Sequence, residues 1–273
     1  YDRERLELWR EAVDTEVSVE VWRKSVNGLL GLGDYTGALE YMMQSLPVIE
    51  TTGNRRAVGN VLMNIGSIYY AQGHYREALE WYSRSIVLFE EVGARRNLGL
   101  VTTNVGSVYM RFGDYAQALE CFLKSLAVSE ELGDRYGRGI LLMNIGQVYR
   151  ETGDTEQALE YFLRSLAVRE ESGDKSGQAE ALMSSVGLLA TKGEMERALA
   201  FGERALILFC EMEHLRGQGE VLYELGCVFR SVNEPEKASE MLGNSLVCHR
   251  KTGNRSGEVL VSVELAHLCV GQA

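Results

Sequence analysis

The sequence predicts an all-α fold, a right-handed superhelical solenoid of antiparallel helix pairs with about six full repeats and partial helices at both ends. Three observations predict this class. A glycine, usually followed by Asp or Glu, recurs every 40 residues, and an asparagine continues the series: Gly33, Gly73, Gly113, Gly153, Gly193 and Asn233. An alanine follows five residues after each of these positions: Ala38, Ala78, Ala118, Ala158, Ala198 and Ala238. The chain has only two prolines, which favours helix nearly everywhere.

Successive copies of the unit are closely similar. Residues 104–133 and 144–173 align without a gap, and 19 of the 30 positions are identical. A second glycine series has the same period, with Glu213 as its exception: Gly53, Gly93, Gly133, Gly173 and Gly253. Each 40-residue unit therefore contains two glycine positions, one after each helix of the pair.

The first helix of the unit is predicted over residues 135–152. Leu141, Ile145 and Val148 fall at i, i+4 and i+7, which is the spacing of an amphipathic helix. Gly153-Asp154 ends this helix, because glycine readily takes the left-handed backbone past a helix end.

The second helix of the unit is predicted from Thr155 to Gly173. Ala158, Phe162 and Ser165 repeat the i, i+4, i+7 spacing. Each helix of the pair has about 17 residues, or about 26 Å.

Small residues recur in the middle of the first helix, at Gly66, Gly106, Gly146 and Gly226. Glycine costs about 1 kcal/mol relative to alanine there. A recurring cost of this kind predicts a close crossing against the alanine series of the second helix. Large side chains are expected beside the small ones: Tyr69, Tyr109, Tyr149, Phe122 and Phe162.

The motifs Asn144-Ile145-Gly146-x-x-Tyr149, Gly153-Asp154 and Ala158-x-x-x-Phe162 resemble the tetratricopeptide repeat signature, and the resemblance covers essentially the whole chain. The usual unit has 34 residues, whereas this one has 40 and lacks the proline after the second helix. The longer form is similar to the repeats of Pins-type spindle-orientation scaffolds. It also resembles arrays attached to bacterial adenylate cyclases, sensor kinases and Rap-type regulators.

One array is expected to span residues 1–273. Residues 1–13 align with the end of a preceding second helix, and residues 255–271 with a final first helix. The full repeats are predicted at 15–52, 55–92, 95–132, 135–172, 175–212 and 215–251. The apolar residues Val261, Val263, Leu265, Leu268 and Val270 favour a truncated array over a polar capping helix at the end.

Composition restricts the classes of partner. The formal net charge of −11 opposes nucleic-acid binding and an anionic membrane surface. No run of 18 apolar residues occurs. The five cysteines are odd in number and lack CxxC spacing, which is typical of unpaired thiols in a reducing compartment. We therefore expect a cytoplasmic protein.

No set of catalytic residues is evident, so we expect a protein that is not an enzyme and needs no cofactor or metal. The four histidines occupy different repeat positions. The glycine-rich segment 31–37 is interpreted as a turn between helices, because it does not follow a strand as a phosphate loop does. The recurring serines, such as Ser125 and Ser165, fall at one position of the second helix, where small residues pack.

Asparagine recurs in the first helix, at Asn64, Asn104 and Asn144, although it is a poor helix former. The family resemblance implies that this position lines a concave groove, where asparagine amides bind the main chain of an extended peptide. The alternative is that each amide only holds a neighbouring helix.

The resemblance and helical spacing add further predicted groove residues: Arg23, Asn27, Ser67, Tyr70, Ser107, Arg111, Gln147, Arg150 and Glu224. Arg23, Asn27, Asn64 and Asn104 resemble the carboxylate clamp of some cochaperones of the family. Leu100 stands where the second lysine of that clamp is expected.

The predicted groove changes in charge along the chain. Ser184 and Glu224 replace the asparagine in later repeats, and Glu180 and Glu220 add negative charge. An oriented ligand with opposite charges at its two ends is therefore expected. We predict an interaction scaffold that binds a protein or peptide. The alternative is a regulatory input domain of a larger signalling protein. Self-association through the apolar ends is a further possibility.

Overall fold

The computed structural model describes residues 34–271, and the side chains of residues 34–268. The predicted partial helix at 1–13 and the first helix of repeat 15–52 lie outside the described residues. Helices connected by short turns make up the described part. They are α3 Tyr35–Thr51, α4 Arg55–Ala71, α5 Tyr75–Glu91, α6 Arg95–Phe112, α7 Tyr115–Glu131, α8 Arg135–Glu151, α9 Thr155–Ser172, α10 Lys175–Thr191, α11 Met195–Glu211, α12 Leu215–Ser231, α13 Pro235–Thr252 and α14 Arg255–Gly271. The prediction of an all-α repeat solenoid is confirmed.

We name the first helix of each pair an A helix and the second a B helix. The A helices are α4, α6, α8, α10, α12 and α14, and the B helices are α3, α5, α7, α9, α11 and α13. The chain divides into two compact units, one up to Leu132 and one from Gly133. The division falls between two of the predicted repeats. The single array over residues 1–273 stays a prediction.

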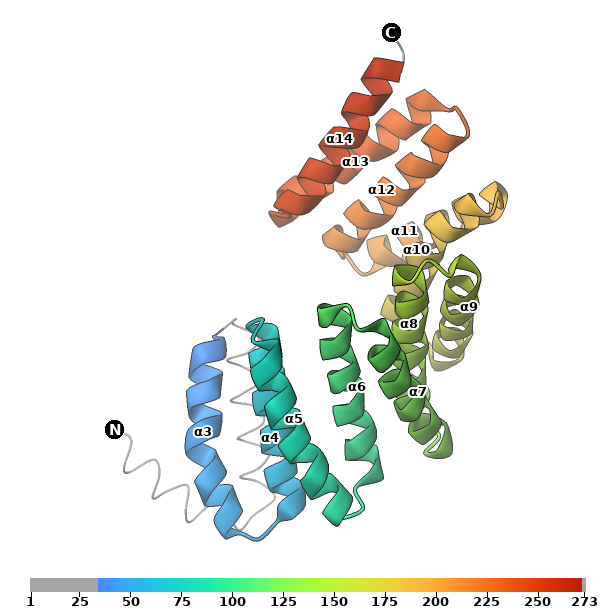
Figure 1. Cartoon of the computed structure of the whole chain (residues 1–273). Helices are drawn as coiled ribbons and strands as arrows, with labels where there is room; N and C mark the ends of the chain where they lie inside the picture. The colour runs from blue at the N-terminus through green and yellow to red at the C-terminus, as the bar shows by residue number, and fades with distance from the viewer. Residues whose placement is uncertain (1–33, 272–273) are drawn as a thin grey trace. The chain divides into compact units, whose positions relative to one another are not determined.

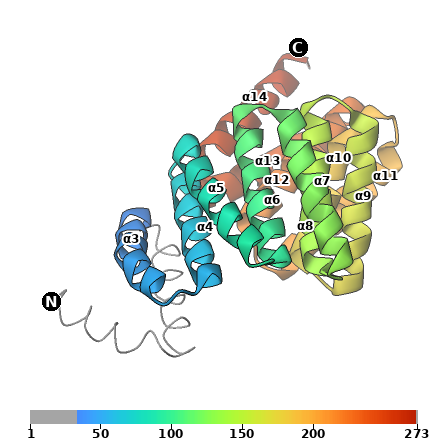
Figure 2. The ribbon, with the colours of Figure 1, turned by 60° about the horizontal axis from the view of Figure 1, so that its bottom comes forward.

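Within each unit, helices pack in the order of the chain. In the first unit α4 packs on α5, and α6 on α7 (Figure 1). In the second unit α8 packs on α9, and α12 on α13 (Figure 2). A helices also contact one another, as α4 contacts α6, and α10 contacts both α8 and α12. Each unit therefore has a surface formed by successive A helices, which we name the A-helix face.

The glycine positions act as predicted at helix ends. Gly173 takes a φ of 71° after α9, and the Asp174 carboxylate then accepts a hydrogen bond of 3.0 Å from the backbone N–H of Gly177 in α10. The same side-chain cap occurs at Asp34, Asn54, Asp114, Asp134, Asp154 and His214. Glu213 and Asn233, the two non-glycine members of the series, also have a positive φ, of 53° and 59°. The turn geometry therefore persists where the glycine is lost.

The mid-helix glycines lie at the predicted close crossings. A Cβ on Gly146 would lie 2.5 Å from the ring of Phe162 and 3.2 Å from the carbonyl oxygen of Ala158. The equivalent Gly106 faces Phe122 at 2.7 Å. The ring of Tyr149 stacks on Tyr161 with 5.4 Å between centroids. The glycine is required because the aromatic ring of the B helix occupies the volume of its side chain.

The recurring serines of the B helices bind the main chain of the A helices. The hydroxyls of Ser85, Ser125, Ser165 and Ser245 each donate to the carbonyl oxygen of the residue 26 positions earlier, at 2.8, 2.9, 2.8 and 2.6 Å. Three of these serines, Ser85, Ser165 and Ser245, are fully buried. This contact explains the serine series as a structural feature of the helix pair.

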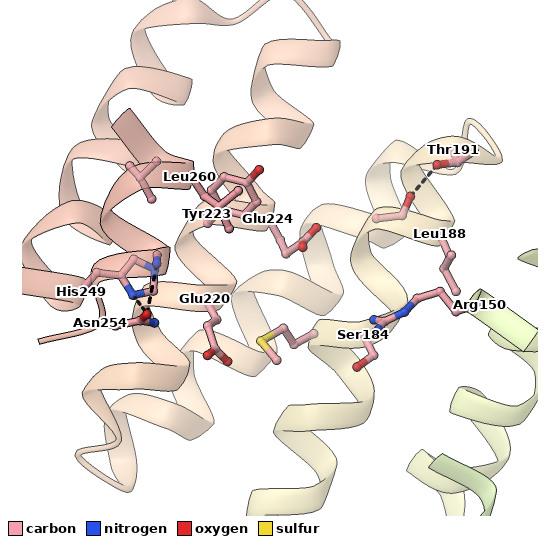
Figure 3. Close-up of a pocket in the computed structure, with 14 residues that line it drawn as sticks. Arg150, Ser184, Leu188, Thr191, Glu220, Tyr223, Glu224, His249, Asn254 and Leu260 are labelled. Atoms are coloured by element: carbon pink, nitrogen blue, oxygen red, sulfur yellow. Dashed lines mark hydrogen bonds between the residues drawn. The ribbon is translucent and has the colours of Figure 1, made fainter. Parts of the chain in front are cut away.

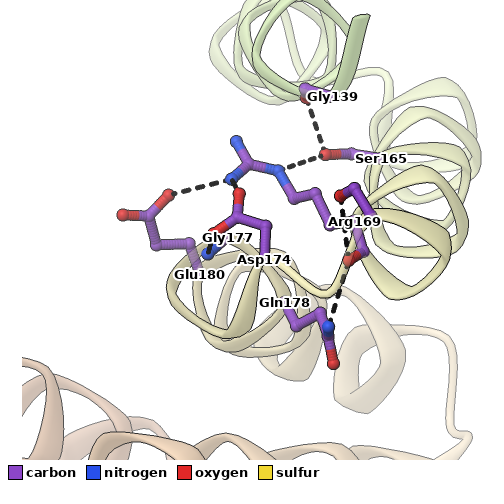
Figure 4. A network of polar contacts seen from close by, with 8 residues as sticks. Gly139, Ser165, Arg169, Asp174, Gly177, Gln178 and Glu180 are labelled. Atoms are coloured by element: carbon purple, nitrogen blue, oxygen red, sulfur yellow. Dashed lines mark hydrogen bonds and ion pairs between the residues drawn. The ribbon is translucent and has the colours of Figure 1, made fainter. Parts of the chain in front are cut away.

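A buried arginine joins α9 to α10 (Figure 4). The Arg169 guanidinium pairs with the Asp174 carboxylate at 2.8 Å, and its Nε donates to Ser165 Oγ at 3.1 Å. Glu180 lies 3.9 Å away on α10. Glycine at 177 is needed beside the arginine, because a Cβ there would overlap the guanidinium. Phe89 and Phe209 occupy the same repeat position, so a charge replaces an aromatic ring at this junction.

Some apolar residues of α14 are buried and others are exposed to solvent. Val261 is fully buried against the rest of the second unit, whereas Val259, Leu260 and Val263 are 64%, 56% and 48% exposed. None of the described helices is long and apolar enough to cross a lipid bilayer.

Candidate functional site

The predicted site residues that the structure describes lie on A helices. Asn64, Ser67 and Tyr70 are on α4, and Asn104, Ser107 and Arg111 are on α6, all in the first unit. Asn144, Gln147 and Arg150 are on α8, and Glu224 is on α12, in the second unit. Arg23 and Asn27 lie outside the described residues, and so does the clamp that they were predicted to form.

The three asparagines are half-buried. The side-chain amides of Asn64, Asn104 and Asn144 make no hydrogen bond to any residue that the structure describes. A half-buried amide without a protein partner retains its full capacity to donate and accept. Among the described residues, the three amides therefore have unused hydrogen-bonding groups on the A helices.

The two predicted serines form hydrogen bonds within the protein. Ser107 donates to the carbonyl oxygen of Thr103 in the preceding turn at 3.1 Å. Ser67 donates likewise to Met63 and accepts a bond of 3.1 Å from the hydroxyl of Tyr82. Burial raises the pKa of Tyr82 to about 12, so its hydroxyl remains a donor at neutral pH.

The structure brings Tyr70 and Arg111 together on neighbouring A helices of the first unit. Arg111 Nε donates to the Tyr70 hydroxyl at 3.1 Å, and the guanidinium carbon lies 5.9 Å from the ring centroid. This hydrogen bond raises the pKa of Arg111. The pair presents a cation on the A-helix face of the first unit.

A pocket of about 540 Å³ opens on the A-helix face of the second unit (Figure 3). It includes the predicted residues Arg150 and Glu224. The other lining residues are Met183, Ser184, Gly187, Leu188, Thr191, Glu220, Tyr223, His249, Asn254, Gly257, Leu260 and Val261. Helices α8, α10, α12 and α14 supply most of the lining, so successive A helices form most of the pocket.

Charge in this pocket is mixed. Burial raises the pKa of Glu224, and the nearby charge of Arg150 opposes that shift. Burial also raises the pKa of Tyr223 to about 12. Glu220 pairs with Arg216 at 3.0 Å. Of the two carboxylates in the pocket, Glu220 and Glu224, Glu224 is thus the one that other protein groups stabilise least.

Several residues that line the pocket were not predicted from the sequence. Tyr223 continues the series Met63, Thr103, Met143, which lies beside the asparagines, so the repeat period could have identified it. His249 and Asn254 gave no such signal. His249 is a buried B-helix residue whose Nδ1 lies 3.2 Å from the Asn254 amide nitrogen.

A second pocket, of about 460 Å³, lies in the first unit among α3, α4 and α5, away from the predicted asparagines. Arg55 lines it and pairs with Glu91. Among the described residues, no group of three His, Cys, Asp or Glu side chains is arranged to hold a metal ion. Cys121, Cys210, Cys227 and Cys248 are free thiols.

The paired helices, the glycine crossings and the A-helix face define a helical-repeat protein. A tetratricopeptide repeat model matches residues 20–91 and 98–171, and a second model of the same repeat matches residues 143–209. The chain therefore belongs to the tetratricopeptide repeat family. No curated protein matches the sequence.

Solved structures share the fold. A signal transduction ATPase with numerous domains and a tetratricopeptide repeat sensor, from Pyrococcus horikoshii, is 14% identical with a TM-score of 0.78, over 98% of this chain and 41% of that one. A Rap protein complexed with competence and sporulation factor is 13% identical with a TM-score of 0.66, over 92% and 74%. YrrB, described as having an unusual peptide-binding site, is 20% identical with a TM-score of 0.50, over 75% and 90%.

Proposed function

We propose that the protein is an interaction scaffold that binds a peptide or an extended partner segment on the A-helix faces of its units. The observation that carries the proposal is the set of half-buried asparagine amides at Asn64, Asn104 and Asn144, none of which bonds a described residue. Asparagine lowers helix stability, so its repetition without a structural bond favours a role in ligand binding. An extended segment offers the alternating main-chain donors and acceptors that such amides bind.

Family membership supports a protein-interaction or regulatory role, and two of the structural neighbours support the finer proposal. YrrB is described as a repeat protein with a peptide-binding site, and the Rap protein is complexed with a factor. The Tyr70–Arg111 pair in the first unit and the pocket around Glu224 in the second would each add contacts for side chains of a segment bound to that unit.

Selection from a displayed library of random peptides tests this proposal with the full chain. Peptides that bind the wild type are expected to lose roughly tenfold or more in affinity for the triple variant Asn64→Ala, Asn104→Ala, Asn144→Ala. Alanine favours helix, so circular dichroism should be unchanged. The matched control replaces three amides of B helices, Gln44→Ala, Gln117→Ala and Gln157→Ala, and should bind as the wild type does. Equal binding by both triple variants, or no selected peptide at all, would contradict the proposal.

A second function, as a regulatory input domain, is favoured by the neighbour in which a tetratricopeptide repeat sensor is part of a signal transduction ATPase. In that case ligand binding would shift the population of states of an attached effector. The gene sequence around this chain tests the idea. An effector domain in the same reading frame supports it, and its absence contradicts it.

A further inference from the structure

We propose that the pocket of the second unit binds the basic side chain of a lysine or arginine in a peptide partner, with Glu224 as its counter-ion. This inference rests on the proposed peptide binding and specifies what this part of the A-helix face recognises.

Glu224 is a carboxylate for which the fold makes room but which has no partner among the described residues. It points from α12 toward α10, where a Cβ on Gly187 would lie 3.2 Å from its Oε2 (Figure 3). No hydrogen bond or ion pair joins Glu224 to any described residue. Taking a carboxylate out of water without a compensating bond is unfavourable. Glycine at 187 therefore leaves room for the carboxylate itself beside α10.

The next repeat shows the same carboxylate with its cation in place. Glu264 lies 40 positions after Glu224 and pairs with Arg230 of α12 at 3.0 Å. The residue 40 positions before Arg230 is Ala190, on α10. The protein therefore repeats the acid at Glu224 and omits the arginine that neutralises its equivalent. Glu224 and Glu264 both lie on A helices of the second unit. The missing arginine beside Glu224 therefore leaves a place for a cation from a ligand.

Arg150 does not take this role. Its guanidinium reaches toward Ser184 (Figure 3). It pairs with Glu151 at 3.8 Å. It also bonds the side chain of Gln147. Arg150 acts on Glu224 only as a nearby charge, and Glu220 on the same wall is already paired with Arg216. Glu224 is therefore the carboxylate of the α12 wall that lacks a cation among the described residues.

The rest of the pocket suits the stem of a basic side chain. Met183, Leu188 and Leu260 line it together with the two carboxylates. Lysine and arginine bury their aliphatic stems along apolar surface while the charged end reaches a polar partner. A charge-assisted bond between the end group and Glu224 would then fix the position of the peptide along the face.

Peptides selected on the full chain from a random displayed library provide the test. We expect them to share a lysine or arginine at one position. Replacing that residue by norleucine should lower affinity for the wild type roughly tenfold, and change affinity for Glu224→Gln by less than about twofold. Ala190→Arg recreates the internal cation and should abolish the preference in the same way. Glu203→Gln, which removes an exposed carboxylate from α11, should behave as the wild type.

Each other outcome overturns the inference, and the pattern shows how. Peptides that bind without a shared basic residue, or with an acidic one directed at Arg150, leave the scaffold function intact and remove the cation site. The same holds if norleucine costs as much on Glu224→Gln as on the wild type. If no peptide is selected, the proposed function fails first and the inference fails with it.

Discussion

At the residue scale, Glu224 differs from the other members of its repeat position. Asn64, Asn104 and Asn144 are neutral amides, and Glu264 has Arg230. Glu224 alone combines burial that raises its pKa with the lack of any bond to a described residue. A residue that costs folding free energy without a structural return is a candidate for function, because stability and binding compete at such sites.

Glu224→Gln is therefore expected to stabilise the free protein at neutral pH, by about 1 kcal/mol. Because folding raises the pKa of this acid, the protonated form is favoured in the folded state. Its stabilising contribution is complete below the unfolded pKa of about 4.3 and is lost as pH rises through the folded pKa. The variant and the wild type should thus differ least near pH 4 and most at pH 7. Urea unfolding at both pH values measures this difference.

The control for this prediction is Glu203→Gln, since that residue is exposed on α11. Its effect should stay within about 0.5 kcal/mol at both pH values. If Glu224→Gln were destabilising at pH 7, the carboxylate would have an internal role, and the unpartnered state described above would be wrong.

At the element scale, the helix pair could be predicted almost completely. The spacing of apolar residues and the Gly-Asp turns predicted helices beginning at Arg135 and Thr155, where α8 and α9 begin. The close helix crossing at Gly146 was predicted because glycine recurs at this mid-helix position although it lowers helix stability. Such a recurrence indicates a close contact with the neighbouring helix in each repeat. Arg169 could not be predicted, since a charged residue in a B helix is normally solvated. Only packing shows that it lies beneath Gly177 of the next helix.

Asp174→Ala is expected to destabilise the protein by about 3 kcal/mol, because Arg169 would remain buried without its main counter-ion. Asp154→Ala provides the matched comparison. Asp154 caps α9 as Asp174 caps α10 but pairs with no buried arginine, so its loss should cost about 1 kcal/mol. Midpoints of urea unfolding measure both. Equal costs would show that the cap, rather than the ion pair, accounts for the effect of Asp174.

At the scale of the whole molecule, the period of 40 continues through residues 132 and 133 and gives no sign of the division into two units. The sequence also could not identify the unpaired state of Glu224. The Arg230–Glu264 pair joins residues 34 positions apart on successive A helices, and this offset depends on how the helices pack. Periodicity therefore predicts which residues are equivalent, whereas packing decides which of them meet.

The second unit contains its own hydrophobic interior. One cluster includes Phe162, Leu182 and Phe209, and another includes Leu159, Leu189 and Val228. Every residue that lines the pocket around Glu224 also falls within residues 133–273. In repeat proteins, stability is approximately the sum of the repeats and the interfaces between neighbours. A fragment that keeps whole repeats should therefore keep both its structure and its pocket.

We expect residues 133–273, expressed alone, to be helical, to unfold cooperatively and to bind the same basic peptides as the full chain. The matched fragment 155–273 lacks α8, so it exposes the face of Phe162 that covers Gly146 and loses Arg150. It should melt at a lower temperature, because α9 would lack the helix that pairs with it. Circular dichroism melts and peptide titrations separate the two fragments. If 133–273 were unfolded while the full chain is stable, the second unit would depend on residues before Gly133, and its compact contacts would be insufficient for folding.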